Sequence, residues 1–207
     1  MKIGIIGAGK IGATVAQLFI KAGHAVAISN SRGPESLKEL VTQLGDNAIA
    51  LSKNDAAAFG EIVLLAVPWS DATALPDAAL VKDKIVIDAM NPYKPGGGLF
   101  DLGKSTSSEE TALKLPGSTI VKAFNTKNFK HLEQGGRKDL PLRERKAIFV
   151  AGDSVEAKAK ISRLIEEIGF AAVDTGSLHD GGKKQQPESA VYNKDMSCAE
   201  AHEVLGK

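Results

Sequence analysis

The chain opens with KIGII at residues 2–6, followed directly by GAGKIG at residues 7–12, and this stretch decides the fold. The first segment is almost wholly apolar, which is typical of a strand buried on both faces of a sheet. Apolar residues then recur at helical spacing from Ile11 to Ala22, and Gly23 ends the predicted helix. A GxGxxG turn between a strand and a helix is the context in which this motif binds a dinucleotide.

The three glycines of this turn have different expected roles. Gly7 permits the tight turn, Gly9 lets the backbone approach a pyrophosphate, and Gly12 lets the helix pack closely on the strand. The helix N-terminus adds free N–H groups and a partial positive charge. A glycine-rich turn that binds no ligand is the alternative. We therefore predict that a dinucleotide site begins with Gly7, Ala8, Gly9, Lys10, Ile11 and Gly12.

The residues after the second predicted strand, 24–29, indicate which dinucleotide is bound. NAD enzymes usually place Asp or Glu there, about 20 residues beyond the glycines, to bind the ribose 2′-hydroxyl. This chain has Asn30, Ser31 and Arg32 instead, and its first carboxylate is Glu35. These hydroxyl, amide and guanidinium donors suit a 2′-phosphate, because a guanidinium can bind two phosphate oxygens at once. The turn predicts NADP(H), with a solvated surface arginine as the alternative.

Strand and helix patterns alternate along the rest of the chain. This alternation predicts parallel βαβ units in a doubly wound, mainly parallel Rossmann sheet of the α/β class. We assign residues 1–175 to the NADP-binding domain. Residues 176–207 form a short C-terminal extension that packs on the same domain or on a partner subunit. The eight predicted strands are 2–6, 24–29, 47–51, 62–67, 84–88, 119–123, 146–151 and 171–175, and later helices are expected over 34–44, 153–168 and 197–205.

Composition argues against several classes of protein. The 207 residues include 26 Lys+Arg and 25 Asp+Glu, and the net charge of +1 gives no global attraction to nucleic acid or a membrane surface. The single cysteine, Cys198, excludes an internal disulfide, and no metal-ligand spacing is present. The longest strongly apolar run, residues 62–68, is far shorter than the roughly 18 residues of a membrane helix. We expect a soluble, cytoplasmic protein without a metal.

Four segments together resemble one known family: GAGKIG, SNSRG at 29–33, LLAVPW at 64–69 and DAMNPY at 88–93. From Met1 to about Thr175 the chain is similar to the NADPH-dependent coenzyme F420 reductases, also called F420H2:NADP oxidoreductases. The cytoplasmic domain of the Steap metalloreductases is related to them. The resemblance implies NADPH binding and hydride exchange with a flat acceptor such as coenzyme F420, FMN or FAD. By position it implies 2′-phosphate contacts from Ser31 and Arg32, and a cleft bordered by Val67, Pro68 and Trp69.

Ligands of an open α/β sheet lie beyond the carboxyl ends of its strands. Asn91 and Asn125 are expected there, where they would bind the nicotinamide carboxamide or the acceptor, or else cap loops. We place Thr175–Leu178 at the same crevice and His179 near its mouth. The predicted cofactor contacts from this region are Ala66, Val67, Pro68, Asn91 and Asn125.

Hydride transfer between two rings requires geometry and exclusion of water, so no catalytic residue is assigned. A carbonyl acceptor would need a proton donor, for which Lys122 is the candidate. The commoner alternative is that a strand-end lysine points to solvent.

Three functions remain open. The first is an NADPH-dependent oxidoreductase acting on a flavin-like acceptor, and the second is a reductase of a small carbonyl or imine, similar to pyrroline-5-carboxylate reductase. The second normally needs a helical domain, and the 32 residues after Thr175 are too few to form one. The third is an NADP-sensing domain without catalysis. A short tail and a single-domain cleft also predict a homodimer in which the second subunit covers the acceptor.

Overall fold

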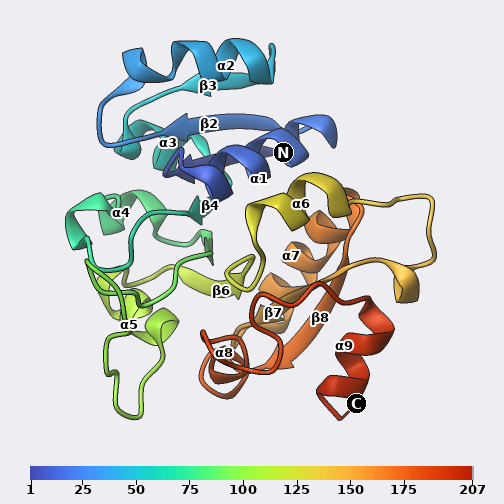
Figure 1. Cartoon of the computed structure of the whole chain (residues 1–207). Helices are drawn as coiled ribbons and strands as arrows, with labels where there is room; N and C mark the ends of the chain where they lie inside the picture. The colour runs from blue at the N-terminus through green and yellow to red at the C-terminus, as the bar shows by residue number, and fades with distance from the viewer. Residues whose placement is uncertain (207) are drawn as a thin grey trace.

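A computed structural model describes residues 1–206, which form one eight-stranded sheet with helices on both faces (Figure 1). The strand order is β3-β2-β1-β4-β5-β6-β7-β8, and β1 to β6 are parallel. The predicted doubly wound, mainly parallel α/β sheet is therefore confirmed. The strands are β1 Lys2–Ile6, β2 Ala25–Ser29, β3 Ala48–Ala50, β4 Ile62–Leu65, β5 Ile85–Asp88, β6 Thr119–Ala123, β7 Ala147–Ala151 and β8 Ala171–Gly176.

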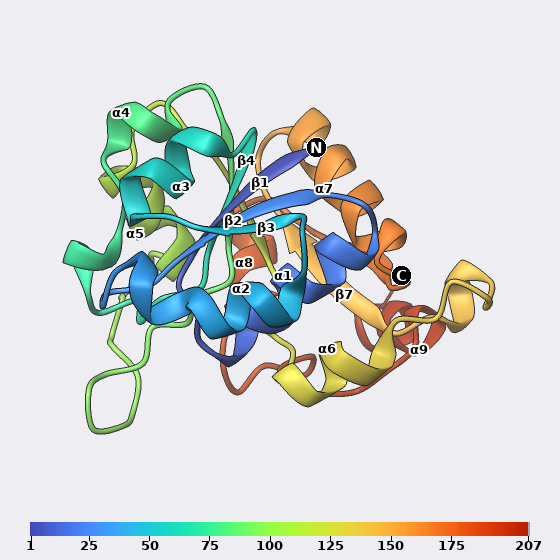
Figure 2. The same cartoon turned by 90° about the horizontal axis from the view of Figure 1, so that it is seen from above.

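Two layers of helices cover the sheet, and Figure 2 shows α1 and α2 on the side opposite α3. The first layer is α1 Lys10–Lys21, α2 Lys38–Leu44, α6 Phe129–Gly135 and α7 Val155–Glu167. The second layer is α3 Lys53–Phe59, α4 Ala78–Val81, α5 Ser107–Lys114, α8 Asp180–Lys184 and α9 Cys198–Val204. No described helix combines the length and the apolar character needed to cross a membrane.

The alternation of side chains along the strands divides the core between these layers. Ile3 and Ile5 of β1 pack with Phe19 of α1 on one face, whereas Ile6 packs with Ala56 of α3 on the other. All five are buried. Full burial of a large apolar side chain contributes roughly 1.5–3 kcal/mol, so these contacts anchor α1 and α3 on opposite faces of β1.

The last two strands reverse direction. β7 pairs antiparallel with β6, with Lys122 opposite Ala151, and β8 is parallel to β7. The helix between β6 and β7, α6, lies at the carboxyl edge of the sheet, where Phe129 faces the Lys10 ammonium at 4.8 Å from its ring centroid. Because α6 does not carry the chain back to the amino edge, β7 starts at the carboxyl edge and runs the other way.

Two helix starts differ from the prediction. The segment expected as one helix from Pro34 is a 3-10 turn over Pro34–Leu37 followed by α2. The N-cap of α7 is Ser154, whose hydroxyl accepts the N–H of Ala157 at 3.1 Å. Asp153, the expected first residue, instead accepts the N–H of Leu178 at 2.8 Å, a contact with the C-terminal segment that the sequence alone does not reveal.

The C-terminal segment packs on the same sheet. Val191, Met196 and Ala201 form a cluster with Phe149 of β7 and Val173 of β8.

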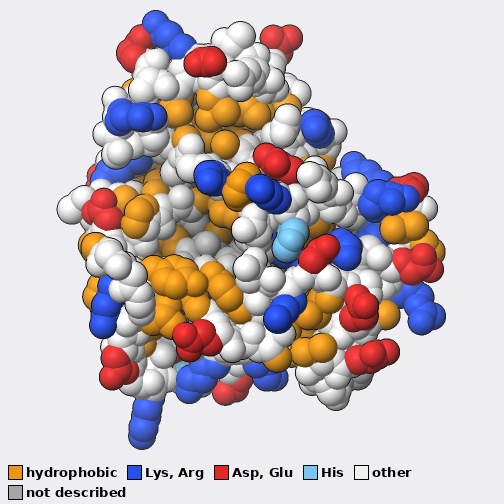
Figure 3. Space-filling model, in the orientation of Figure 1, with side chains coloured by type: hydrophobic (Ala, Val, Ile, Leu, Met, Phe, Trp, Pro, Cys, Tyr) orange, Lys and Arg blue, Asp and Glu red, His pale blue; other side chains and the backbone are white. Residues whose placement is uncertain are grey.

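The surface seen in the orientation of Figure 1 is hollowed between α4 and α6, with hydrophobic side chains on both sides of the hollow (Figure 3).

Candidate functional site

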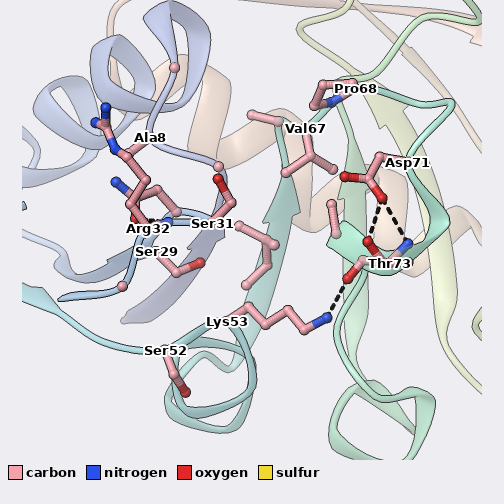
Figure 4. A pocket seen from close by; sticks show the side chains of 17 residues that line it. Ala8, Ser29, Ser31, Arg32, Ser52, Lys53, Val67, Pro68, Asp71 and Thr73 are labelled. Carbon is pink, nitrogen blue, oxygen red and sulfur yellow. Dashed lines mark hydrogen bonds between the residues drawn. The ribbon is translucent and has the colours of Figure 1, made fainter. Parts of the chain in front are cut away.

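A cleft of about 780 Å³ lies at the carboxyl ends of β1, β2 and β4, a volume within the usual range for small-molecule sites. In Figure 4, Ser31 and Arg32 lie on one side, and Val67, Pro68 and Asp71 lie on the other. Nine predicted cofactor residues line the cleft: Gly7, Ala8, Gly9, Asn30, Ser31, Arg32, Ala66, Val67 and Pro68.

The glycine turn has the geometry that its motif requires. Gly7 has φ +108°, a conformation that favours glycine, and its N–H donates to the carbonyl of Ser29 at 3.0 Å. A Cβ on Gly12 would lie 1.8 Å from the carbonyl oxygen of Gly7, so only glycine allows α1 to approach the turn. A Cβ on Gly9 would meet no atom within 4 Å. Within residues 1–206 no side chain caps α1 at Gly9, and the first turn of α1 carries no acid, so its N–H groups and partial positive charge are available to an anion.

Gly9→Ala separates binding from folding. The backbone at Gly9 has φ −74° and ψ −173°, which alanine adopts without strain, so we expect the free energy of unfolding to stay unchanged or rise slightly. The added methyl lies where a pyrophosphate would approach, so the Kd for NADPH should rise by about tenfold or more. Urea unfolding and NADPH fluorescence titration measure the two effects. Unchanged NADPH affinity would place the pyrophosphate elsewhere.

The turn after β2 holds Arg32 at the rim of the cleft. The side-chain oxygen of Asn30 accepts the N–H of Arg32 at 3.0 Å, and its amide nitrogen donates to Ser36 at 2.9 Å. The Ser36 hydroxyl donates to the carbonyl of Gly33 at 2.7 Å. No described residue forms an ion pair with the Arg32 guanidinium. Glu35, the nearest carboxylate in the sequence, pairs with Lys38 instead. Asn30 therefore supports the turn, while Ser31 and Arg32 present free donors.

Four polar residues that line the cleft come from segments to which the sequence did not point: Ser52, Lys53, Asp71 and Thr73. The Lys53 ammonium, at the start of α3, donates to the carbonyl of Thr73, and Ser52 lies beside it (Figure 4). Asp71 accepts from the Thr73 hydroxyl at 2.6 Å, and the hydrogen bonds from Thr73 lower the pKa of Asp71. These residues carry no motif. Only the position of β3 beside β2 brings the start of α3 to the cleft.

Several predicted residues lie outside this cleft. The Lys10 side chain extends toward Phe129, Ile11 packs against the core, and Gly12 is buried under the turn. Trp69 donates to the carbonyl of Ser107 at 2.9 Å and is half-buried, so it packs against neighbouring residues and does not line the cleft.

Among the described residues, no group of three or more His, Cys, Asp or Glu side chains could hold a metal ion.

Asn91 and Asn125 lie together beyond β5 and β6. Asn125 donates to the side-chain oxygen of Asn91 at 3.1 Å and to the carbonyl of Gln185 at 2.8 Å. Asn91 donates to the backbone carbonyl of Asn125 at 2.9 Å and to the Tyr192 hydroxyl at 3.3 Å. All four amide protons are thus used within the protein. Binding of the nicotinamide carboxamide by either residue stays a prediction.

Both sequence interpretations of Lys122 are wrong. The side chain is fully buried, so it neither points to solvent nor offers its ammonium to a ligand. Its ammonium donates to the Ser107 and Ser108 hydroxyls at 3.1 and 3.0 Å and to the Met90 carbonyl at 3.3 Å. Ser108 in turn donates to Asp88 at 2.7 Å. Burial lowers the pKa of Lys122, and the neighbouring Asp88 partly opposes this shift.

The placement of Thr175–Leu178 and His179 at the crevice is also wrong. Because β8 runs opposite to β6, the chain leaves β8 toward the amino end of β6, where Leu178 lines a small hollow with Thr119. His179 bonds to Glu109 of α5 at 2.9 Å. The segment after α8 returns to the carboxyl edge of β6 instead, where the N–H of Asn193 donates to Thr126 at 2.9 Å.

Comparison with known proteins indicates the same cofactor class as the turn after β2. Residues 2–92 match a family model described as NADP oxidoreductase coenzyme F420-dependent. The metalloreductase STEAP3 of Rattus norvegicus is 28% identical over 180 residues, which are 86% of this chain and 34% of that protein. The chain therefore spans about a third of the length of this curated relative.

Two solved structures match nearly the whole chain. The hypothetical protein SMa0349 from Sinorhizobium meliloti is 32% identical with a TM-score of 0.83, and the match covers 95% of both chains. A protein from Arthrobacter sp. FB24, named a "putative F420 dependent NADP-reductase", is 24% identical with a TM-score of 0.76. That match covers 95% of this chain and 99% of the other. The second likeness shows the fold alone.

Proposed function

Because the chain belongs to the family of coenzyme F420-dependent NADP oxidoreductases, whose members are NADP-dependent, we propose that it transfers a hydride between NADP(H) and a flat, flavin-like acceptor. The observation that carries the proposal is the turn after β2. Ser31 and Arg32 lie at the rim of the cleft with free donors, and no carboxylate lines that turn to bind a ribose 2′-hydroxyl. A 2′-phosphate fits these donors better than a hydroxyl.

The residues of the cleft fit NADP(H). The uncapped N-terminus of α1 and the open side of Gly9 would hold the pyrophosphate, and Ser31 and Arg32 would hold the 2′-phosphate. The bound dinucleotide supplies the hydride. The protein's part is to orient the two rings and keep water away, which the apolar wall of Val67 and Pro68 supports.

The acceptor is tested by NADPH oxidation, followed at 340 nm, with coenzyme F420, FMN, FAD, menadione and a ferric chelate, and with NADH in place of NADPH as the control. We expect turnover with a flat ring acceptor and a preference for NADPH. Tight NADPH binding without turnover of any acceptor would contradict the proposal and favour an NADP-sensing domain.

A further inference from the structure

Four side chains form a hydrogen-bonded group at the carboxyl edge of β5 and β6, outside the cleft already described. We name Asn91, Tyr93, Asn125 and Tyr192 the Tyr–Asn cluster. Three of them follow β5 or β6, and Tyr192 is brought in by the C-terminal segment. β5 lies next to β4, whose loop lines the cofactor cleft, and ligands of such sheets lie at this edge.

The asparagines orient Tyr192 and have no N–H left to donate. The two amide protons of Asn91 go to Asn125 and Tyr192, and those of Asn125 go to Asn91 and Gln185. The amide nitrogen of Asn91 is a donor and not an acceptor, so the Tyr192 hydroxyl oxygen accepts the hydrogen bond between them and keeps its own proton free to donate. Phe124, directly before Asn125, is buried with φ +68°, a conformation that a phenylalanine rarely adopts. A backbone held in this way is typical of ligand sites.

The two phenols have one proton to spare. The hydroxyl oxygens of Tyr93 and Tyr192 are 3.0 Å apart, and the hydrogen bond between them uses one of their two O–H protons. Within residues 1–206, no other group accepts the second proton from either hydroxyl. Tyr93 is 44% exposed and Tyr192 is half-buried, so a ligand can reach the pair. Burial and the Tyr93 hydroxyl raise the pKa of Tyr192, which keeps it a donor at neutral pH.

We propose that Tyr93 and Tyr192 donate a hydrogen bond to a carbonyl oxygen of a flat ring acceptor, of the quinone or isoalloxazine class. This inference rests on the proposed function. When the hydride of NADPH forms a bond to such a ring, NADP⁺ is left and negative charge develops on the carbonyl oxygen. The phenolic O–H stabilises that charge, and a proton from water completes the reduction. Tyr192 is the main donor because Asn91 anchors its hydroxyl, whereas within residues 1–206 the Tyr93 hydroxyl bonds to Tyr192 alone.

The test measures binding, so it does not depend on turnover. Menadione and FMN are titrated into the protein saturated with NADP⁺, by calorimetry, for the wild type, Tyr93→Phe, Tyr192→Phe and the double variant. We expect Tyr192→Phe and the double variant to bind roughly tenfold more weakly, and Tyr93→Phe about twofold, because Tyr192 then keeps its anchor and its proton. Glu188→Gln, an exposed change in the same segment, is the matched control and should bind as the wild type does.

The outcomes separate this inference from the proposed function. Equal binding by all variants, or binding of neither probe by the wild type, would overturn the inference. Weakened binding in Tyr192→Phe without NADPH oxidation by the wild type would support the donor pair and overturn hydride transfer. NADPH oxidation by the wild type that none of the substitutions changes, together with unchanged binding, would support hydride transfer and overturn the donor pair. Unchanged melting temperature and NADPH affinity show that a variant is folded.

Discussion

Arg32→Asp is expected to weaken NADPH roughly 10- to 150-fold and to leave the Kd for NADH unchanged or lower. The guanidinium of Arg32 lies at the rim of the cleft and pairs with no carboxylate of the described residues, so its N–H groups are available to the 2′-phosphate. The substitution replaces that donor by an anion that repels the phosphate. The same carboxylate can accept the 2′-hydroxyl of NADH. The backbone N–H of the residue can still donate to Asn30, so the turn persists.

Fluorescence titration of both cofactors at constant ionic strength measures this change in preference. Lys138→Asp, an exposed change in the loop before β7, alters the net charge equally and should leave both affinities within about twofold. An equal loss for NADPH and NADH would show that the 2′-phosphate lies elsewhere, with Lys53 on the other wall of the cleft as the next candidate.

Lys122→Met should lower the free energy of unfolding by about 3–5 kcal/mol. The Lys122 ammonium donates to Ser107 and Ser108 and is the cation beside the buried Asp88, to which Ser108 donates, so its loss removes the donor to both hydroxyls and leaves a buried carboxylate without a neighbouring cation. Urea unfolding at pH 7 measures the loss. Lys160→Met, an exposed change on α7, should stay within about 0.5 kcal/mol of the wild type. A loss below about 1 kcal/mol for Lys122→Met would contradict the role given to this lysine.

The pH dependence of the free energy of unfolding, compared between the wild type and Lys122→Met, checks the lowered pKa of Lys122. Between that pKa and the ordinary value of 10.5, the unfolded chain binds more protons than the folded chain. The contribution of Lys122 to the free energy of unfolding therefore rises with pH through this window. The free energy of unfolding of the wild type minus that of Lys122→Met should therefore grow as the pH rises through this window. A difference that falls with pH would indicate a raised pKa.

Short-range patterns in the sequence predicted much of the fold. All eight strands were recognised because their apolar runs are local, and a glycine or proline lies within a few residues of at least one end of most of them. The glycine turn and the Ser31–Arg32 turn were found for the same reason: each depends on residues a few positions apart. Nine of the predicted cofactor residues line the cleft, while Asn91 and Asn125 are engaged with each other beside it.

The remaining features depend on contacts between distant segments. Lys122 is buried because Met90, Ser107 and Ser108 surround its ammonium, and these partners lie 14 to 32 residues away in the sequence. The reversal of β7 follows from the position of α6, and it moves Thr175–Leu178 away from the crevice.

The sequence by itself determined the α/β class, the strands and the dinucleotide turn, because each arises from the conformational preferences of neighbouring residues. Only the tertiary structure decided that Lys53 borders the cleft and that Tyr192 meets Asn91, 101 residues away. The physical reason is that strand direction and the path of the C-terminal segment are set by packing of whole elements, which no local pattern encodes.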